Sequence, residues 1–292
     1  MARRKPPTRH GLVIVDKPSG MTSHDVVSVL RKQLGERRIG HAGTLDPDAT
    51  GVLLVGVGYV TRLLTFLSGL DKTYTAQIVL GSSTSTLDSS GAVTATHDMS
   101  NISIEDVQRV VKENFVGKIL QVPPMVSALK VDGVRLHELA RQGIEIERAA
   151  RELTIHSFKV FGMSEPGVVD VEIHCSSGTY IRSLADDLGR ALGGSAHLRN
   201  LRRISVGGFL QSECSNLDDV IVHPPITAVR TMSRVVADEQ MQTMIKHGRE
   251  LEKFDSPAPW VLVDEQNAVL AVYELSPSGR AKPSVVMANA VA

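Results

Sequence analysis

The residues best suited to chemistry in this 292-residue chain lie between Gly40 and Gly51. The segment reads Gly-His-Ala-Gly-Thr-Leu-Asp-Pro-Asp-Ala-Thr-Gly and places Asp46 in a tight loop between two apolar stretches. Loops on a rigid scaffold are where catalytic groups usually lie. A carboxylate there can act as a nucleophile or stabilise positive charge on a sugar carbon, as in glycosidases. Taken alone, however, Asp46 followed by Pro47 is better explained as ordinary turn chemistry.

The elements that must position this loop alternate between strands and helices. Apolar runs and alternating apolar and polar residues predict strands, whereas apolar residues at a spacing of three and four predict helices. We expect strands over 11–15, 51–57, 72–80 and 169–175, and helices over 22–34, 60–67, 103–114, 137–142 and 179–192. After Pro224-Pro225, residues 260–273 predict a β-hairpin with a polar turn. The fold class is therefore α/β with a mixed sheet, followed by a small β module.

The loop around Asp46 resembles the signature of the TruB family of pseudouridine synthases, G-H-x-G-x-L-D-P-x-A-T-G, at every fixed position. In that family the aspartate is catalytic. Further segments resemble the family in the same order along about two thirds of the chain, namely 16–23, 72–74, 123–130, 177–189 and 196–203. One departure is Val126, where the family usually carries an aromatic residue.

The resemblance implies a fold, a reaction and a substrate. The fold is the pseudouridine synthase fold over 1–225, with an insertion at about 85–150, and a PUA-like RNA-binding module over 226–292. The reaction breaks the bond between uracil N1 and ribose C1′, turns the base, and rejoins it through C5, at the T-loop uridine in position 55 of tRNA. It needs no cofactor and no metal. Direct attack of Asp46 on C1′ and formation of a glycal both agree with the sequence.

The family match also implies roles for side chains that would meet the target base. Tyr74 stacks on this base and helps to remove the C5 proton, although a phenol is a poor base unless its surroundings change its pKa. Arg182 pairs with Asp46 and keeps it ionised. Tyr180 packs near the base, and Leu201 lines the same pocket.

A uridine inside a folded RNA loop must leave its stack before such groups can reach it, and unstacking costs a few kcal/mol. The resemblance assigns His41 to the gap left by the flipped base, where an aromatic ring contributes roughly 1–3 kcal/mol by stacking. Basic side chains are expected to contact phosphates. They are Lys17, Arg37, Arg38, Lys130, Arg199, Arg202 and Arg203.

Bulk composition limits the other classes of protein. The chain has 32 basic and 32 acidic residues, so its net charge of zero is unusual for a nucleic-acid-binding protein. The charges are polarised, with nine Lys/Arg against five Asp/Glu in residues 1–50 and seven against eleven in residues 213–292. The two cysteines suggest neither a zinc site nor a disulfide framework. We expect a cytoplasmic monomer that binds the tRNA T stem-loop, with no signal peptide and no membrane span.

Three other functions stay open at this point. A non-catalytic tRNA-folding chaperone would use the same surface, but the intact Asp46, Tyr74 and Arg182 argue against a dead enzyme. A base-excising hydrolase would break the same bond and finish with water in place of C5. A synthase of this fold could also act on another RNA, and the T-loop-specific segment 123–130 argues against that alternative.

Overall fold

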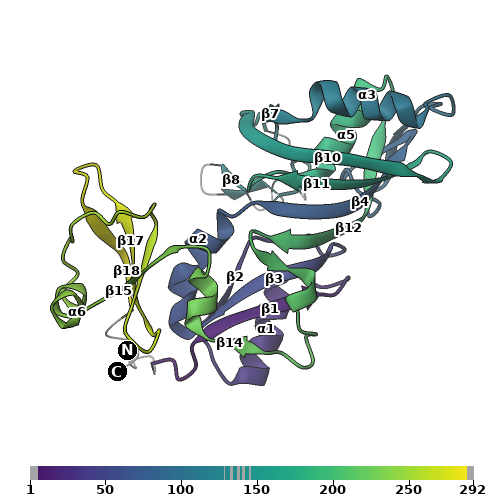
Figure 1. The fold of residues 1–292 in the computed structure, drawn as a ribbon. Coiled ribbons are helices and arrows are strands. Elements are labelled where there is room, and N and C mark those ends of the chain that lie inside the picture. The colour runs from purple at the N-terminus through teal and green to yellow at the C-terminus, as the bar shows by residue number, and fades with distance from the viewer. Residues whose placement is uncertain are drawn as a thin grey trace.

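The structure is a computed structural model that describes residues 6–127, 129–131, 134–136, 139, 142–144 and 146–287. Its largest feature is a mixed sheet of ten described strands (Figure 1). They are β1 (Gly11–Lys17), β2 (Ile39–Ala42), β3 (Thr50–Val57), β4 (Lys72–Leu80), β7 (Gly117–Gln121), β10 (Arg151–Glu165), β11 (Val168–Cys175), β12 (Ala196–Val206), β13 (Phe209–Leu210) and β14 (Val222–His223). Their order is β14-β1-β3-β12-β4-β11-β10-β7, with β2 paired to β3 and β13 to β12.

The centre of the sheet is the contact between β3 and β12, which is parallel, whereas the other pairs are antiparallel. It joins Thr50 to Arg202 and Gly51 to Arg203. Gly51 has a φ of +104°, and a Cβ atom there would lie 2.2 Å from the Arg203 carbonyl oxygen, so only glycine allows this approach. The end of the Asp46 loop is thereby attached to β12.

Helices cover the sheet in two regions. The helix α1 (Ser23–Leu34) begins with a capping box made by Thr22 and Asp25, and it packs on β1 and β3. In the other half, α3 (Ile104–Asn114) and α5 (Ile181–Ala191) pack against one face of β4, β10 and β11, as Figure 1 also shows. Residues of β4 alternate between buried and half-buried, so its second face is left partly open.

The C-terminal residues form a separate four-stranded sheet beside the N-terminal half (Figure 1). Its elements are β15 (Ser233–Val236), α6 (Glu239–Lys246), β16 (Trp260–Val263), β17 (Val269–Leu275) and β18 (Ala281–Val286). Trp260 and Tyr273 lie in the core of this module. Val261, Val263 and Val272 face the other way and share a core with β1 and β3. The module is thus docked on the main sheet by apolar contact.

The predicted fold class, mixed α/β with a small C-terminal β module, is confirmed. The boundary at residue 225 and the insertion over 85–150 stay predictions. Residues 85–150 hold β6 (Val93–Thr96), α3, β7, β8 (Lys130–Val131) and β9 (Val134–Arg135), while β5 (Ser82–Thr84) precedes them and pairs with β6. The predicted helix over 137–142 falls largely outside the described residues.

One local prediction differs from the structure, and two long strands were not predicted. The apolar stripe over 60–67 is not one α-helix, because a 3-10 turn, η1 (Gly58–Leu63), precedes a short α2 (Leu64–Ser68). Its spacing of three and four fits both kinds of helix. The two longest strands of the sheet, β10 and β12, had no predicted element. Two further 3-10 helices, η2 (Gln211–Glu213) and η3 (Pro225–Val229), lie along the chain between β13 and β15. Among the described residues, no helix has both the length and the apolar character needed to cross a membrane.

Candidate active site

Asp46 and Arg182 form a two-pronged ion pair across 136 residues of sequence. Arg182 Nε donates to Asp46 Oδ2 at 2.9 Å, and Arg182 Nη2 donates to Asp46 Oδ1 at 3.1 Å. The arginine side chain is only 5% exposed, whereas the aspartate side chain is 40% exposed. A fork of two parallel bonds fixes the plane of the carboxylate as well as its position. The aspartate therefore presents a defined face to solvent.

The loop that carries Asp46 is held from both sides by α1 and β1. Leu45 N donates to Ser23 Oγ at 3.0 Å, and Ser23 Oγ donates back to Leu45 O at 3.3 Å. On the other side, Lys17 Nζ donates to Pro47 O at 2.8 Å. Both residues that flank Asp46 are thus tied to regular elements, which preorganises the carboxylate.

Arg182 lies in the first turn of α5 and has further partners. Its Nη1 donates to Thr86 O, and its Nη2 donates to Val126 O, both at 2.9 Å. Asp88 Oδ2 lies 3.6 Å from Arg182 Nε. The contact made by Val126 uses its backbone carbonyl, so it does not depend on the aromatic side chain that the family usually carries there.

Tyr180 caps the N-terminus of α5 through its backbone. Tyr180 N donates to Gln121 Oε1 at 2.8 Å, and Gln121 Nε2 donates to Tyr180 O at 3.1 Å. Gln121 is buried at the end of β7. This reciprocal pair fixes the start of the helix that carries Arg182, and the Tyr180 side chain lines the adjacent pocket.

A pocket of about 270 Å³ opens beside the Asp46 carboxylate. That volume lies just below the range of small-molecule pockets, which is roughly 300–1,000 Å³. Leu201 reaches it because β12 has an irregular register between Arg199 and Arg202, where Asn200 adopts a φ of +53°. The pocket is lined by Gly43, Thr44, Leu45, Asp46, Ser68, Lys72, Tyr74, Ser127, Ser176, Gly178, Thr179, Tyr180, Ile181, Arg182, Leu201 and Arg203. The structure thus brings Asp46, Tyr74, Tyr180, Arg182 and Leu201 together.

Tyr74 lines the pocket from the buried face of β4, where it is 8% exposed. Burial raises the pKa of its hydroxyl above the ordinary value, and the neighbouring Arg203 opposes this shift in part. The hydroxyl therefore carries its proton at neutral pH. A phenolate formed in this environment is scarce, but it is also a stronger base than an exposed phenolate.

Lys17 and Arg203 are buried, and the structure contradicts their prediction as phosphate contacts. Lys17 is fully buried, and its Nζ donates to the carbonyl oxygens of Pro18, Met21 and Pro47 at 2.6–2.8 Å. Burial lowers its pKa to about 8. Arg203 is 1% exposed and donates to the carbonyl oxygens of Val52 and Gly43. Both cations fix the backbone around the Asp46 loop, and Arg203 also lines the pocket.

Lys72 lines the pocket and was not predicted as a site residue. It is 6% exposed, and its Nζ donates to Ser68 O and Leu70 O at 2.7 and 2.6 Å. Burial lowers its pKa to about 8. The sequence could have indicated this role for Lys72, because Lys72 and Tyr74 are two residues apart on one strand and their side chains therefore point to the same face.

His41 lies on β2, outside the residues that line the pocket. Its ring meets that of His24 edge to face, with centroids 5.2 Å apart. Burial lowers the pKa of His41 to about 4, and the nearby His24 and Arg203 act in the same direction. The ring is therefore neutral at neutral pH.

The remaining residues that were predicted to contact phosphate differ in exposure and in ion pairing. Arg37 and Arg38 are exposed. Arg202 is paired with Asp16 through two bonds of 3.1 and 2.6 Å, and Arg199 is paired with Glu165 at 2.9 Å. The side chain of Lys130 lies outside the described residues.

Comparison with known proteins identifies the family. Residues 31–181 match the TruB family pseudouridylate synthase N-terminal domain, and residues 182–224 match the tRNA pseudouridylate synthase B C-terminal domain. A protein of Rhodococcus jostii named tRNA pseudouridine synthase B is 43% identical over 98% of this chain and 97% of its own length. A protein of the same name from Thermobifida fusca is 43% identical over 96% of this chain and 99% of its own length.

Among solved structures, the Cbf5 complex with Nop10 and Gar1 matches with a TM-score of 0.69 at 26% identity, over 90% of this chain and 78% of that chain. An H/ACA ribonucleoprotein bound to a substrate RNA containing 2′-deoxyuridine also reaches a TM-score of 0.69, at 23% identity, and supports the fold. It covers 94% of this chain and 83% of that chain. On the two domain matches and on relatives that align over almost the whole length, this chain belongs to the TruB family of pseudouridylate synthases.

Proposed function

We propose that this protein converts the T-loop uridine at position 55 of tRNA into pseudouridine, with Asp46 as the catalytic carboxylate. The observation that carries the proposal is the Asp46 carboxylate, held by Arg182 and facing a base-sized pocket that Tyr74 lines. The substrate is inferred from the relatives, which are named tRNA pseudouridine synthase B.

The reaction needs no external reactant, because every atom of the base is kept. The bond between N1 and C1′ breaks, and the electron pair leaves with the uracil. Asp46 stabilises the positive charge that develops at C1′, either by bonding to it or by assisting loss of a neighbouring proton. After the base has turned, C5 bonds to C1′, the C5 proton leaves, and N1 takes up a proton.

Arg182 is a positioning residue in this scheme. Its fork orients the Asp46 carboxylate, and its own place is fixed by the carbonyl oxygens of Thr86 and Val126. A carboxylate whose position is set before the substrate arrives needs little reorganisation in the transition state.

Tyr74 and Leu201 provide the walls between which the flipped base would lie. A base stacked on an aromatic ring gains roughly 1–3 kcal/mol. The Tyr74 oxygen, in its scarce phenolate form, is the candidate acceptor for the C5 proton. His41 would stack in the space vacated by the uridine, and its low pKa supports this role because a neutral ring avoids burying a charge between bases.

Affinity for the tRNA backbone is assigned to exposed cations. Arg37 and Arg38 are exposed, although Arg38 Nε donates to Thr61 Oγ1 at 3.2 Å, and Arg202 would have to share its charge with Asp16. The C-terminal module is proposed as PUA-like and RNA-binding. We further infer a monomer in the cytoplasm from the family. Sedimentation with and without tRNA tests the oligomeric state.

The test is to incubate an unmodified tRNA transcript with the wild-type protein, Asp46→Asn and Asp48→Asn. Asp48 is the matched control, because it is an exposed aspartate of the same loop that does not line the pocket. Pseudouridine is mapped by carbodiimide-dependent stops of reverse transcription. We expect a T-loop stop from the wild type and Asp48→Asn, and none from Asp46→Asn.

The other outcomes separate the alternatives. Binding by all three proteins without any stop would favour the tRNA chaperone. Free uracil and an abasic product would identify a hydrolase. A stop from Asp46→Asn equal to that of the wild type would keep the reaction but remove Asp46 from its catalytic role.

A further inference from the structure

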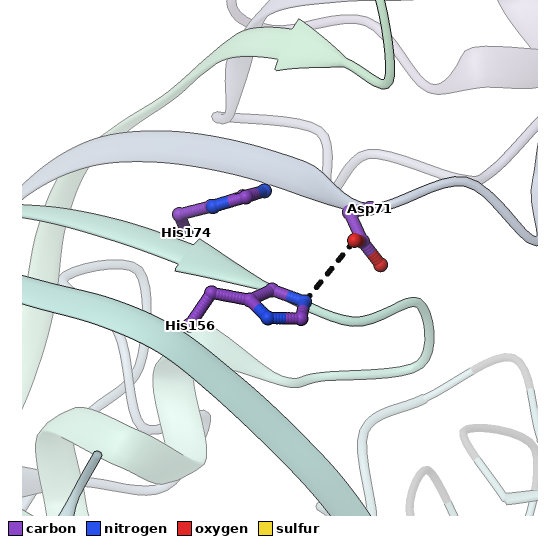
Figure 2. Close-up of side chains that lie close together, drawn as sticks. All are labelled: Asp71, His156 and His174. Atoms are coloured by element: carbon purple, nitrogen blue, oxygen red, sulfur yellow. Dashed lines mark ion pairs between the residues drawn. The ribbon is translucent and has the colours of Figure 1, made fainter. Parts of the chain in front are cut away.

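Two histidines and an aspartate converge on the partly open face of the main sheet (Figure 2). None of the three lines the Asp46 pocket. They are Asp71, just before β4, His156 on β10 and His174 on β11. One ligand atom from each lies within 4.8 Å of the other two. His156 Nε2 is 3.1 Å from Asp71 Oδ2, and the two imidazole rings have centroids 4.6 Å apart.

His156 reaches this cluster at an irregularity in the pairing of β10 with β11. Ile155 pairs with Cys175 and Ser157 pairs with His174, so His156 is an extra residue between two successive pairs. Ile155 and Cys175 are buried in the core under α3 and α5, so alternation places their neighbours His156 and His174 on the opposite, partly open face. The bulge leaves His156 without a pairing residue of its own in β11.

The other two groups are fixed by pairing. His174 is opposite Thr73 of β4, so its side chain shares the face that α3 and α5 leave uncovered. Asp71 is held at the backbone, where its carbonyl oxygen accepts from Gly207 N at 2.7 Å. All three side chains remain partly accessible, which leaves a path for an ion.

We propose that Asp71, His156 and His174 form a site for a divalent transition metal of the zinc class. Two imidazoles and one carboxylate are a donor set that binds zinc with a fourth position left to water. Metal–ligand bonds of about 2.0–2.1 Å imply ligand atoms roughly 3.3 Å apart in a tetrahedron. The contact between His156 and Asp71 already has nearly this length, and rotation of half-exposed side chains closes the remainder.

A metal here joins three elements that are distant in sequence. It would tie the turn before β4 to the hairpin of β10 and β11, with Asp71 next to Lys72 and three residues before Tyr74. Because those side chains point to the opposite face, the ion acts as a structural clip behind the pocket and does not enter it.

The test uses the untagged full chain, stripped with EDTA, and titrates it with Co²⁺ and Zn²⁺ chlorides. Visible absorption of Co²⁺ reports coordination geometry, and calorimetry with Zn²⁺ reports stoichiometry and affinity. The variants are His156→Gln, His174→Gln and Asp71→Asn. His247→Gln is the matched control, because His247 is an exposed histidine at the end of α6.

We expect one equivalent of metal and tetrahedral Co²⁺ bands from the wild type and His247→Gln. Loss of a residue that only hydrogen-bonds to a metal ligand weakens metal affinity by roughly 10- to 100-fold. Replacing a ligand itself should weaken the zinc affinity by at least as much. Zinc should raise the unfolding temperature of the wild type but not that of His156→Gln. Unfolding in EDTA, where all variants should resemble the wild type, separates metal loss from misfolding.

Three results would overturn the proposal. They are the absence of a stoichiometric site in the wild type, unchanged affinity in both histidine variants, or a thiolate-to-Co²⁺ absorption band that assigns the ion to Cys214.

Discussion

Replacing Arg182 with lysine tests whether the fork on Asp46, and not only a positive charge, is needed. Lysine keeps the charge but has a single nitrogen, so it cannot make two parallel bonds to the carboxylate while also serving Thr86 O and Val126 O. At least one charge-assisted bond is lost, and such a bond contributes about 1.5–3 kcal/mol. If that loss falls on the transition state, the rate drops by about 10- to 150-fold.

The assay is single-turnover release of tritium from tRNA labelled at uridine C5, with the enzyme in excess over RNA. Under these conditions the rate reports chemistry after binding. Arg230→Lys is the matched control, because Arg230 makes an equivalent two-pronged pair with Glu213 and neither residue lines the pocket. We expect wild-type turnover from this control.

A rate for Arg182→Lys within twofold of the wild type would refute the reasoning, provided that both proteins unfold at similar temperatures. It would mean that the orientation of Asp46 is set by the backbone ties at Leu45 and Pro47 alone.

Three further variants test other parts of the structure. Tyr74→Phe keeps the ring, so tRNA affinity in filter binding should stay unchanged while tritium release falls by about 10²- to 10⁴-fold; a wild-type rate would exclude the hydroxyl from proton transfer. Lys17→Met leaves three carbonyl oxygens without a donor and should lower the free energy of unfolding in urea by about 2–4 kcal/mol; a loss below 0.5 kcal/mol would contradict its role as a backbone tie. Hydrogen bonds from Arg230 hold the pKa of Glu213 at about 2, below its ordinary 4.5, so this pair stabilises the fold above pH 4.5 and loses that contribution as the pH falls toward 2. Because the pair is one-third exposed, we expect it to contribute only about 1 kcal/mol to the free energy of unfolding. Urea unfolding should show this difference between the wild type and Arg230→Gln at pH 7 but not at pH 2. An equal difference at the two pH values would contradict the assignment.

Periodicity in the sequence predicted the strands that carry the pocket wall. The alternation around Tyr74 on β4 and around Ile173 on β11 matches the observed burial, because each strand has one covered and one half-open face. The contact between Asp46 and Arg182 could not come from such patterns. The residues are 136 positions apart, and only the family motif linked them before the fold was known.

The phosphate contacts were predicted by residue type, and this reasoning failed for the buried cations. Lys17 and Arg203 are satisfied by carbonyl oxygens from segments that are far away in sequence, so their burial depends on the assembled fold. The strand β12 was missed for a related reason. It carries several charged residues and an irregular register at Asn200, and both features hide the alternation on which strand prediction depends.

The position of the buried cations also explains how a chain of zero net charge can serve an RNA reaction. Lys17, Lys72, Arg182 and Arg203 are each at most 6% exposed, and three of them line the pocket beside Asp46. Electrostatic interactions are stronger where water is excluded, so these charges matter more at the pocket than exposed acidic residues elsewhere. When the bond between N1 and C1′ breaks, negative charge develops on the uracil. Fixed cations around the pocket favour that charge without having to move, which is how preorganised sites lower a barrier. Arg182 and Arg203, which hold the Asp46 loop in place, therefore also supply, together with Lys72, the positive field that the departing base requires.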